Sequence, residues 1–76
     1  MLTIYSKDKC EACKNAKDLL TMKGIDFVEI NCDISWEGFD FIVSQGLRSF
    51  PQIYENGQLY VQGGYQGLLK KLSNNS

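Results

Sequence analysis

Two cysteines, Cys10 and Cys13, enclose Glu11 and Ala12 in a Cys-x-x-Cys motif. The motif follows an apolar, β-prone run and opens a pattern that predicts an amphipathic helix to about Lys23. The first thiol then lies at the helix N-terminus, where free backbone N–H groups and the positive end of the helix dipole stabilise a thiolate. Two thiols one helical turn apart after a strand predict a dithiol that cycles between its reduced and disulfide forms.

Two other interpretations of the cysteine pair fit the sequence less well. A closed zinc site needs about four ligands, but the chain has no His and one further cysteine, Cys32. Carboxylates or a second chain would have to complete such a site. A purely structural disulfide would close a very small loop, so its entropic gain would be minimal. We therefore favour redox exchange and expect no metal.

The expected chemistry is nucleophilic attack by the first thiol. The thiolate is the reactive species, and an unperturbed cysteine with a pKa of about 8.5 is only slightly ionised at neutral pH. Lys7, Lys9 and Lys14 lie within a few residues of the first thiol and favour its anion. Cys13 falls on the apolar side of the helix and should be more buried. Cys10 is therefore assigned the attacking role and Cys13 the resolving role.

Length and composition are those of an ordinary small globular domain. The chain has 76 residues, 43% of them hydrophobic and 22% charged, which predicts one domain over residues 1–76 with a frayed tail at 73–76. The net charge of −1 gives no argument for a nucleic-acid or membrane partner. No signal peptide or apolar stretch of membrane-spanning length is visible. With three cysteines, we expect a reducing, cytoplasmic setting.

The elements that position the motif follow from hydrophobic periodicity and turn residues. The expected strands are Leu2–Ser6, Asp26 to Asn31 or Cys32, Gln52–Tyr54 and Gln58–Val61. The expected helices run from after Cys10 to about Lys23, from Trp36 to Ser44 and from Tyr65 to Leu72. The β-α-β-α-β-β-α order predicts an α/β fold. Its first two strands should be parallel through a right-handed crossover, and its last two antiparallel around Asn56-Gly57. The simplest such fold is a four-stranded mixed sheet flanked by helices.

Local signals refine these elements. Ser35 is expected to cap the second helix. Val28, Ile30 and Cys32 alternate with polar residues and are predicted to share a buried face. We interpret Cys32 as a small core residue, with a regulatory thiol as the alternative. Trp36 is interpreted as a residue that packs the second helix.

Three motifs carry a resemblance to a known family: Cys10-Glu11-Ala12-Cys13 after the first strand, Ser49-Phe50-Pro51 before the third, and Gly63-Gly64-Tyr65 after the fourth. In this order and spacing they make the whole chain resemble the glutaredoxins. The stretch 45–51 is also similar to the NrdH-redoxins, the glutaredoxin-like hydrogen donors of ribonucleotide reductase. The resemblance implies the thioredoxin fold in its minimal form, with strand order 2-1-3-4.

The resemblance also implies roles for single residues. In glutaredoxins a lysine at the place of Lys7 contacts the glycine carboxylate of glutathione, whereas Lys14 and Lys17 fit a solvated helix face equally well. The family's proline at the place of Pro51 is cis. A cis bond there would present the backbone of Phe50 to an extended cysteinyl substrate, which could pair with it like an added strand.

The region after the fourth strand binds the γ-glutamyl end of glutathione in this family, which implies contacts from Gly64, Tyr65 and Gln66. Arg48 is expected either to hold a substrate carboxylate or to lie at the surface. The family usually has an Asp where Gln66 and Gly67 stand here, and its absence weakens the case for tight glutathione binding. A second departure is Glu11-Ala12, where many glutaredoxins carry Pro-Tyr.

Three functions remain open on these grounds. The first is a monomeric dithiol glutaredoxin that reduces protein disulfides or glutathione mixed disulfides, with glutathione as co-substrate and no tightly bound cofactor. The second is an NrdH-like redoxin that thioredoxin reductase reduces and that feeds ribonucleotide reductase. The third is a non-catalytic iron–sulfur or metal-binding module. The Gly63-Gly64-Tyr65 motif and the missing Trp-containing C-terminal motif of NrdH-redoxins favour the first.

Overall fold

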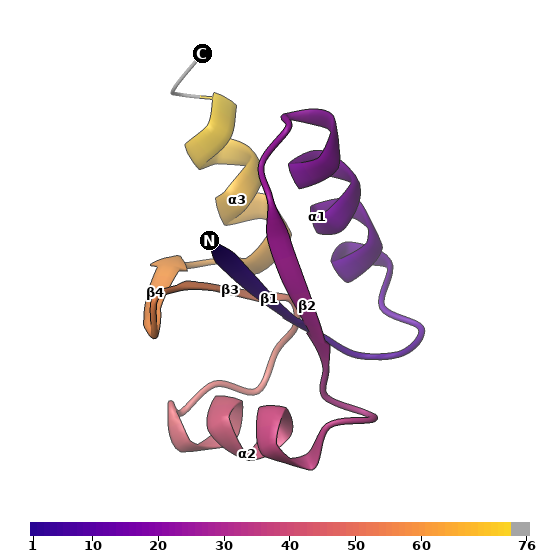
Figure 1. The fold of residues 1–76 in the computed structure, drawn as a ribbon, viewed down its shortest axis with the longest axis vertical. Coiled ribbons are helices and arrows are strands. Elements are labelled where there is room, and N and C mark those ends of the chain that lie inside the picture. Colours follow the sequence, from indigo (N-terminus) through magenta and orange to yellow (C-terminus); the bar gives the residue numbers. More distant parts are fainter. Residues whose placement is uncertain (74–76) are drawn as a thin grey trace.

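The computed structural model describes residues 1–73. The strands are β1 (Leu2–Ser6), β2 (Phe27–Asn31), β3 (Gln52–Glu55) and β4 (Gln58–Val61), and the helices are α1 (Glu11–Met22), α2 (Trp36–Ser44) and α3 (Gly64–Ser73). The strands form one sheet in the order β2-β1-β3-β4 (Figure 1). The predicted element order, strand order and fold are confirmed, and the bounds differ from the predicted ones by no more than one residue.

The sheet register fixes what lies beside the motif. β1 pairs in parallel with β2, from Leu2 opposite Phe27 to Ser6 opposite Asn31, and α1 is the crossover between them. On its other side β1 pairs antiparallel with β3, with Tyr5 opposite Gln52. The end of β1 and the start of β3 are therefore neighbours. The loop that follows β1 and the loop that precedes β3 meet at the same end of the sheet.

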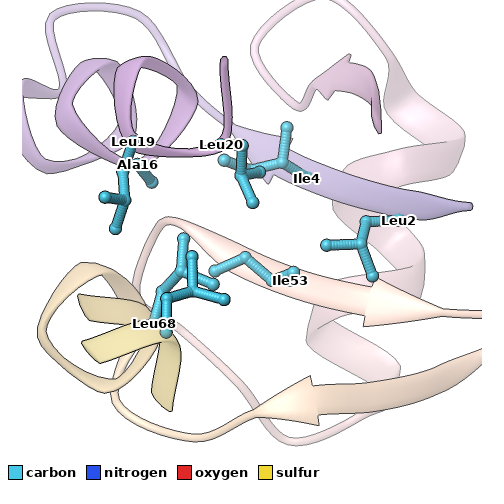
Figure 2. Close-up of a cluster of buried hydrophobic side chains, with 8 residues drawn as sticks. Leu2, Ile4, Ala16, Leu19, Leu20, Ile53 and Leu68 are labelled. Carbon is cyan, nitrogen blue, oxygen red and sulfur yellow. The ribbon is translucent and has the colours of Figure 1, made fainter. Parts of the chain in front are cut away.

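The larger core lies between the sheet and the pair of helices α1 and α3, which share one side of the sheet (Figure 1). Figure 2 shows the side chains of this core pointing toward one another from β1, β3 and both helices. Ile4, Leu20 and Leu68 are fully buried, and burial of an aliphatic side chain of this size stabilises a fold by roughly 1.5–3 kcal/mol. This core holds α1 against the sheet through Ala16, Leu19 and Leu20.

A smaller core lies on the other side of the sheet, which α2 covers (Figure 1). The rings of Tyr5, Phe41 and Tyr54 meet there with centroids 5.1–5.5 Å apart. Cys32 is buried in the same cluster. Burial raises the pKa of the Cys32 thiol, and the Asp33 carboxylate raises it further. The interpretation of Cys32 as a core residue is thus confirmed.

Three expectations are corrected. Val28 is 48% exposed on the edge strand β2, whereas Ile30, two residues further on, lies against Gly38 of α2. Trp36 is 73% exposed, so it does not pack α2 onto the core. Its ring centroid lies 5.9 Å from that of Phe39. Ser73 is the last residue of α3 and not part of a tail. The remainder of the predicted tail, 74–76, lies outside the described residues.

The cap of α2 is confirmed, because the Ser35 hydroxyl accepts a hydrogen bond from the Gly38 N–H at 3.1 Å. The hairpin turn is confirmed as well, with Asn56 and Gly57 both at positive φ. Within residues 1–73, no helix is long and apolar enough to cross a membrane.

Gly67 occupies a position in α3 where only glycine fits. A Cβ at this residue would overlap the carbonyl oxygen of Gln62. The backbone leading into α3 therefore excludes any side chain here, including the acidic one that the family often has in this region.

We expect Gly67→Ala to lower the free energy of unfolding by about 1–3 kcal/mol, because the backbone of α3 must shift to relieve the overlap. Urea unfolding of the oxidised protein measures this. Gln66→Ala, at the preceding and exposed position of the helix, is the control. Its free energy of unfolding should stay within about 0.5 kcal/mol of the wild-type value. A Gly67→Ala protein as stable as the wild type would contradict the overlap, since alanine is otherwise the better helix former.

A charged contact ties α1 to the edge strand β2. The buried Ser6 hydroxyl donates to Glu29 Oε2 at 2.6 Å, and Lys17 Nζ lies 2.9 Å from the same oxygen. The hydrogen bond from Ser6 and then the contacts of Lys17 hold the pKa of Glu29 below its ordinary value of 4.5. A lowered pKa in the folded state means that this carboxylate adds stability above pH 4.5, and that the gain is lost as the pH falls through the lower, folded-state value.

Glu29→Gln should therefore lower the free energy of unfolding at pH 7 by up to about 1 kcal/mol, because the contact is partly exposed. The difference from the wild type should vanish in acid, below the folded-state pKa of Glu29. Chemical unfolding at several pH values measures it, with Glu55→Gln at an exposed position as the control. If the stability difference between Glu29→Gln and the wild type instead grew toward low pH, the contact would not stabilise the ionised carboxylate of Glu29.

Candidate redox site

Cys10 and Cys13 form a disulfide at the start of α1, with their Cα atoms 5.2 Å apart. Cys10 is the N-cap residue of the helix and has an extended backbone, with φ of −111° and ψ of 103°. Its Sγ accepts a hydrogen bond from the backbone N–H of Cys13 at 3.1 Å. The sulfur thus takes the place of the oxygen of an ordinary N-cap side chain, as the motif predicts.

The two sulfurs differ in accessibility. Cys13 is 2% exposed, on the face of α1 that packs toward the sheet, whereas Cys10 is only half-buried. A partner molecule can therefore reach Cys10 first, and Cys13 lies behind it. This asymmetry fits the predicted division into an attacking and a resolving cysteine.

The loop before β3 forms one wall of the site. The Phe50–Pro51 peptide bond is cis, as the resemblance implies, and the carbonyl oxygen of Phe50 lies 3.9 Å from Cys10 Sγ. The buried side chain of Gln52 donates to the carbonyl oxygen of Ser49 at 2.9 Å and lies 3.2 Å from its hydroxyl. Gln52 was missed as a site residue, although a glutamine at the start of a buried strand, directly after the proline, is a usable signal.

The start of α3 abuts the same loop. Gly64 has a φ of +59°, and a Cβ on it would lie 3.2 Å from the carbonyl oxygen of Pro51. The glycine therefore lets the helix N-terminus approach the cis-proline closely. Tyr65 is half-buried against the larger core, and Gln66 is exposed. Of the predicted residues, Phe50 therefore contacts Cys10, and Gly64 lies against Pro51.

A polar hollow of about 590 Å³ lies beside the disulfide. Both cysteines line it together with Lys7, Lys9, Lys14, Lys17, Asp8, Glu11, Glu29 and Asn31. Lys14 pairs with Asp18 at 3.2 Å, and Lys17 pairs with the Glu29 carboxylate of β2. The amine of Lys7 lies 6.0 Å from the centre of the Phe50 ring, at the outer limit of a cation–π contact.

A hydrogen-bond network holds the loop that delivers Cys10. The backbone N–H of Asp8 donates to Asp33 Oδ2 at 2.7 Å, and Asn31 Nδ2 donates to Asp8 Oδ1 at 2.9 Å. Asn31 Oδ1 in turn accepts from the backbone N–H of Asp33 at 2.9 Å. The loop is thereby fixed to the end of β2. This network could not be predicted from sequence, because no local pattern relates residues 25 positions apart.

Arg48, predicted as a possible substrate contact, does not line the cysteine hollow. It is exposed and lines a separate groove with Phe50 and side chains of α2. Among residues 1–73, no three or more His, Cys, Asp or Glu side chains are grouped as metal ligands would be.

Known proteins resemble this chain in sequence and in fold. Residues 2–60 match the family model described as glutaredoxin. The glutaredoxin-like protein NrdH of Lactococcus lactis subsp. cremoris (strain MG1363) is 40% identical over 53 residues, which cover 70% of this chain and 74% of that protein. Glutaredoxin 3 of Escherichia coli (strain K12) is 33% identical over 78 aligned positions, covering 88% of this chain and 94% of that protein.

The structure of NrdH-redoxin from Escherichia coli superposes with a TM-score of 0.78 at 26% identity, covering 93% of this chain and 92% of that one. The family match at residues 2–60 begins with β1, includes the dithiol and the cis-proline loop, and ends within β4. With its Cys10–Cys13 disulfide at a helix N-terminus, this thioredoxin-fold chain belongs to the glutaredoxin family of thiol–disulfide oxidoreductases.

Proposed function

We propose that the protein reduces disulfides in other proteins and mixed disulfides with glutathione, and that glutathione restores its own dithiol. The observation that carries the proposal is the asymmetry of the cysteine pair. An accessible sulfur accepts an amide hydrogen bond at the helix N-terminus, and the second sulfur is buried directly behind it. No tightly bound cofactor is needed, because the two sulfurs supply both electrons.

The reaction begins from the reduced dithiol. The Cys10 thiolate attacks one sulfur of the substrate disulfide, forming a mixed disulfide and releasing the other sulfur as a thiolate that takes up a proton. The Cys13 thiol then loses its proton, and its sulfur attacks Cys10 Sγ and releases the second substrate thiolate. Two electrons have passed from the protein to the substrate, and the protein is left as the disulfide seen in the structure.

Two features support glutathione as the reductant. Lys7 lines the cysteine hollow, where its ammonium group can pair with a carboxylate. The N-terminus of α3, beside Pro51, offers backbone N–H groups from Tyr65 and Gln66 to a second carboxylate. Glutathione carries one carboxylate at each end of its chain and its thiol between them. The peptide would run across Cys10 from one feature to the other.

Reduction by thioredoxin reductase is the second candidate. It is favoured by the 40% identity to an NrdH protein and by the backbone around Gly67, which leaves no room for an acidic side chain that would face the ammonium group of glutathione. In either case we expect a monomer that works in the cytoplasm on protein disulfides, with ribonucleotide reductase among its substrates. Neither nucleic acid nor a membrane is an expected partner.

One comparison separates the two reductants. Turnover of a small disulfide is measured with glutathione, glutathione reductase and NADPH, and in parallel with thioredoxin reductase and NADPH. We expect the first rate to exceed the second by about tenfold or more, which corresponds to about 1.4 kcal/mol of barrier. The reverse ratio would assign the protein to the NrdH-type redoxins.

Replacing the cysteines tests their roles. Cys10→Ser should reduce turnover of every disulfide to the uncatalysed rate, because the attacking sulfur is gone. Cys13→Ser should accumulate a mixed disulfide with a protein substrate, visible by mass spectrometry, and keep at most activity on glutathione mixed disulfides. Cys32→Ala, which removes the buried free thiol, serves as the control and should keep wild-type rates. Full activity of Cys10→Ser would show that the attacking residue is misassigned.

A further inference from the structure

The outer surface of α2 is apolar although it faces away from the core. Trp36, Phe39 and Val43 are 73%, 41% and 51% exposed, and their spacing of three and four residues places them on one face of the helix. Ile42, three residues after Phe39 and next to Val43, is 1% exposed and belongs to the smaller core. The three exposed side chains therefore border the buried part of α2. Within residues 1–73, α2 is the only helix on its side of the sheet (Figure 1).

This surface is hollowed next to the redox site. We call the hollow the α2 groove: its volume is about 480 Å³, and its lining includes Phe39, Ile42, Val43, Leu47, Arg48 and Phe50. Arg48 is the single charged residue in this lining. The groove therefore suits one large apolar side chain with a carboxylate nearby.

Phe50 connects the groove to the disulfide. Its carbonyl oxygen lies 3.9 Å from Cys10 Sγ, and the residue also lines the groove. An extended chain advances about 3.3 Å per residue, so two residues span roughly 7 Å. Side chains two residues apart in an extended chain also point to the same side. In a substrate cysteine bonded to Cys10, the side chain two residues away therefore points to the same side as the reacting sulfur, toward the wall that Phe50 shares with the groove.

We propose that the α2 groove binds an apolar side chain of a disulfide-bearing protein substrate, two residues from the cysteine that reacts with Cys10, with Arg48 pairing with a nearby carboxylate of the same segment. The proposal rests on the proposed function and deepens it, because it assigns the selection of protein substrates to α2. Glutathione has no apolar side chain, so the groove adds nothing to its binding. The groove thus separates protein disulfides from small ones.

Matched peptides test the groove without any dependence on the physiological reductant. Each peptide carries one cysteine as its mixed disulfide with mercaptoethanol, and a leucine or a serine two residues away. The reduced protein is freed of reductant and mixed with each peptide, and the second-order rate constant for loss of its dithiol is measured. The wild type should react about tenfold faster with the leucine peptide, since burial of an apolar side chain in the groove favours its complex.

Variants locate the preference. Phe39→Ser combined with Val43→Ser should reduce the leucine-to-serine ratio to about twofold or less, and leave the rate with hydroxyethyl disulfide within about twofold of the wild type. Met22→Ser removes an apolar side chain that is more exposed than either of these, at the far end of α1, and should keep the tenfold ratio. Circular dichroism confirms that each variant is folded.

The outcomes are distinct. A wild-type protein that reacts with neither peptide nor hydroxyethyl disulfide would refute the proposed function itself. A wild type that reacts with all of them at one rate, or a double variant that slows on hydroxyethyl disulfide as much as on the leucine peptide, would overturn the docking role alone. Sedimentation that shows a dimer abolished by the double variant would assign the groove to a second copy of this chain and also overturn it.

Discussion

The site depends on one hydrogen bond, in which the backbone N–H of Cys13 donates to the sulfur of Cys10. The first turn of any helix leaves N–H groups without partners inside the helix, and a sulfur in the N-cap position accepts one of them. This interaction sets the direction of the Cys10 side chain and places partial positive charge beside it. It exists only while α1 is folded, so the buried contacts of Leu20 and its neighbours act on the chemistry through the helix.

Three segments that are distant in sequence then complete the site around that sulfur. The loop before it is held to the end of β2 by Asp8, Asn31 and Asp33. The cis-proline loop is held by Gln52, and the start of α3 reaches Pro51 because Gly64 has no side chain. Each support comes from a different strand or helix, which explains how so small a chain holds an exposed site in place.

The fold and the dithiol could be predicted from sequence because their signals are local. The Cys-x-x-Cys motif, the Ser35 cap and the Asn56-Gly57 turn each act over a few residues. The helix that begins after Cys10 is marked by apolar residues at helical spacing. The cis bond at Pro51 and the strand order came from family resemblance, since neither has a local signal. The exposure of Val28 and Trp36 was missed because alternation identifies a face but not whether a helix covers it. Contacts such as Asp8 with Asp33 depend on register and needed the structure.

The antiparallel pairing of β1 with β3 has a consequence for how the protein loses activity. Tyr5 lies opposite Gln52, so the strand that leads to the dithiol and the strand that follows the cis-proline are hydrogen-bonded neighbours inside the sheet. Both walls of the site therefore rest on the two central strands, which are the last parts of such a sheet to fray. Heating would then leave the reactive geometry intact until the sheet itself melts, and inactivation would coincide with cooperative unfolding.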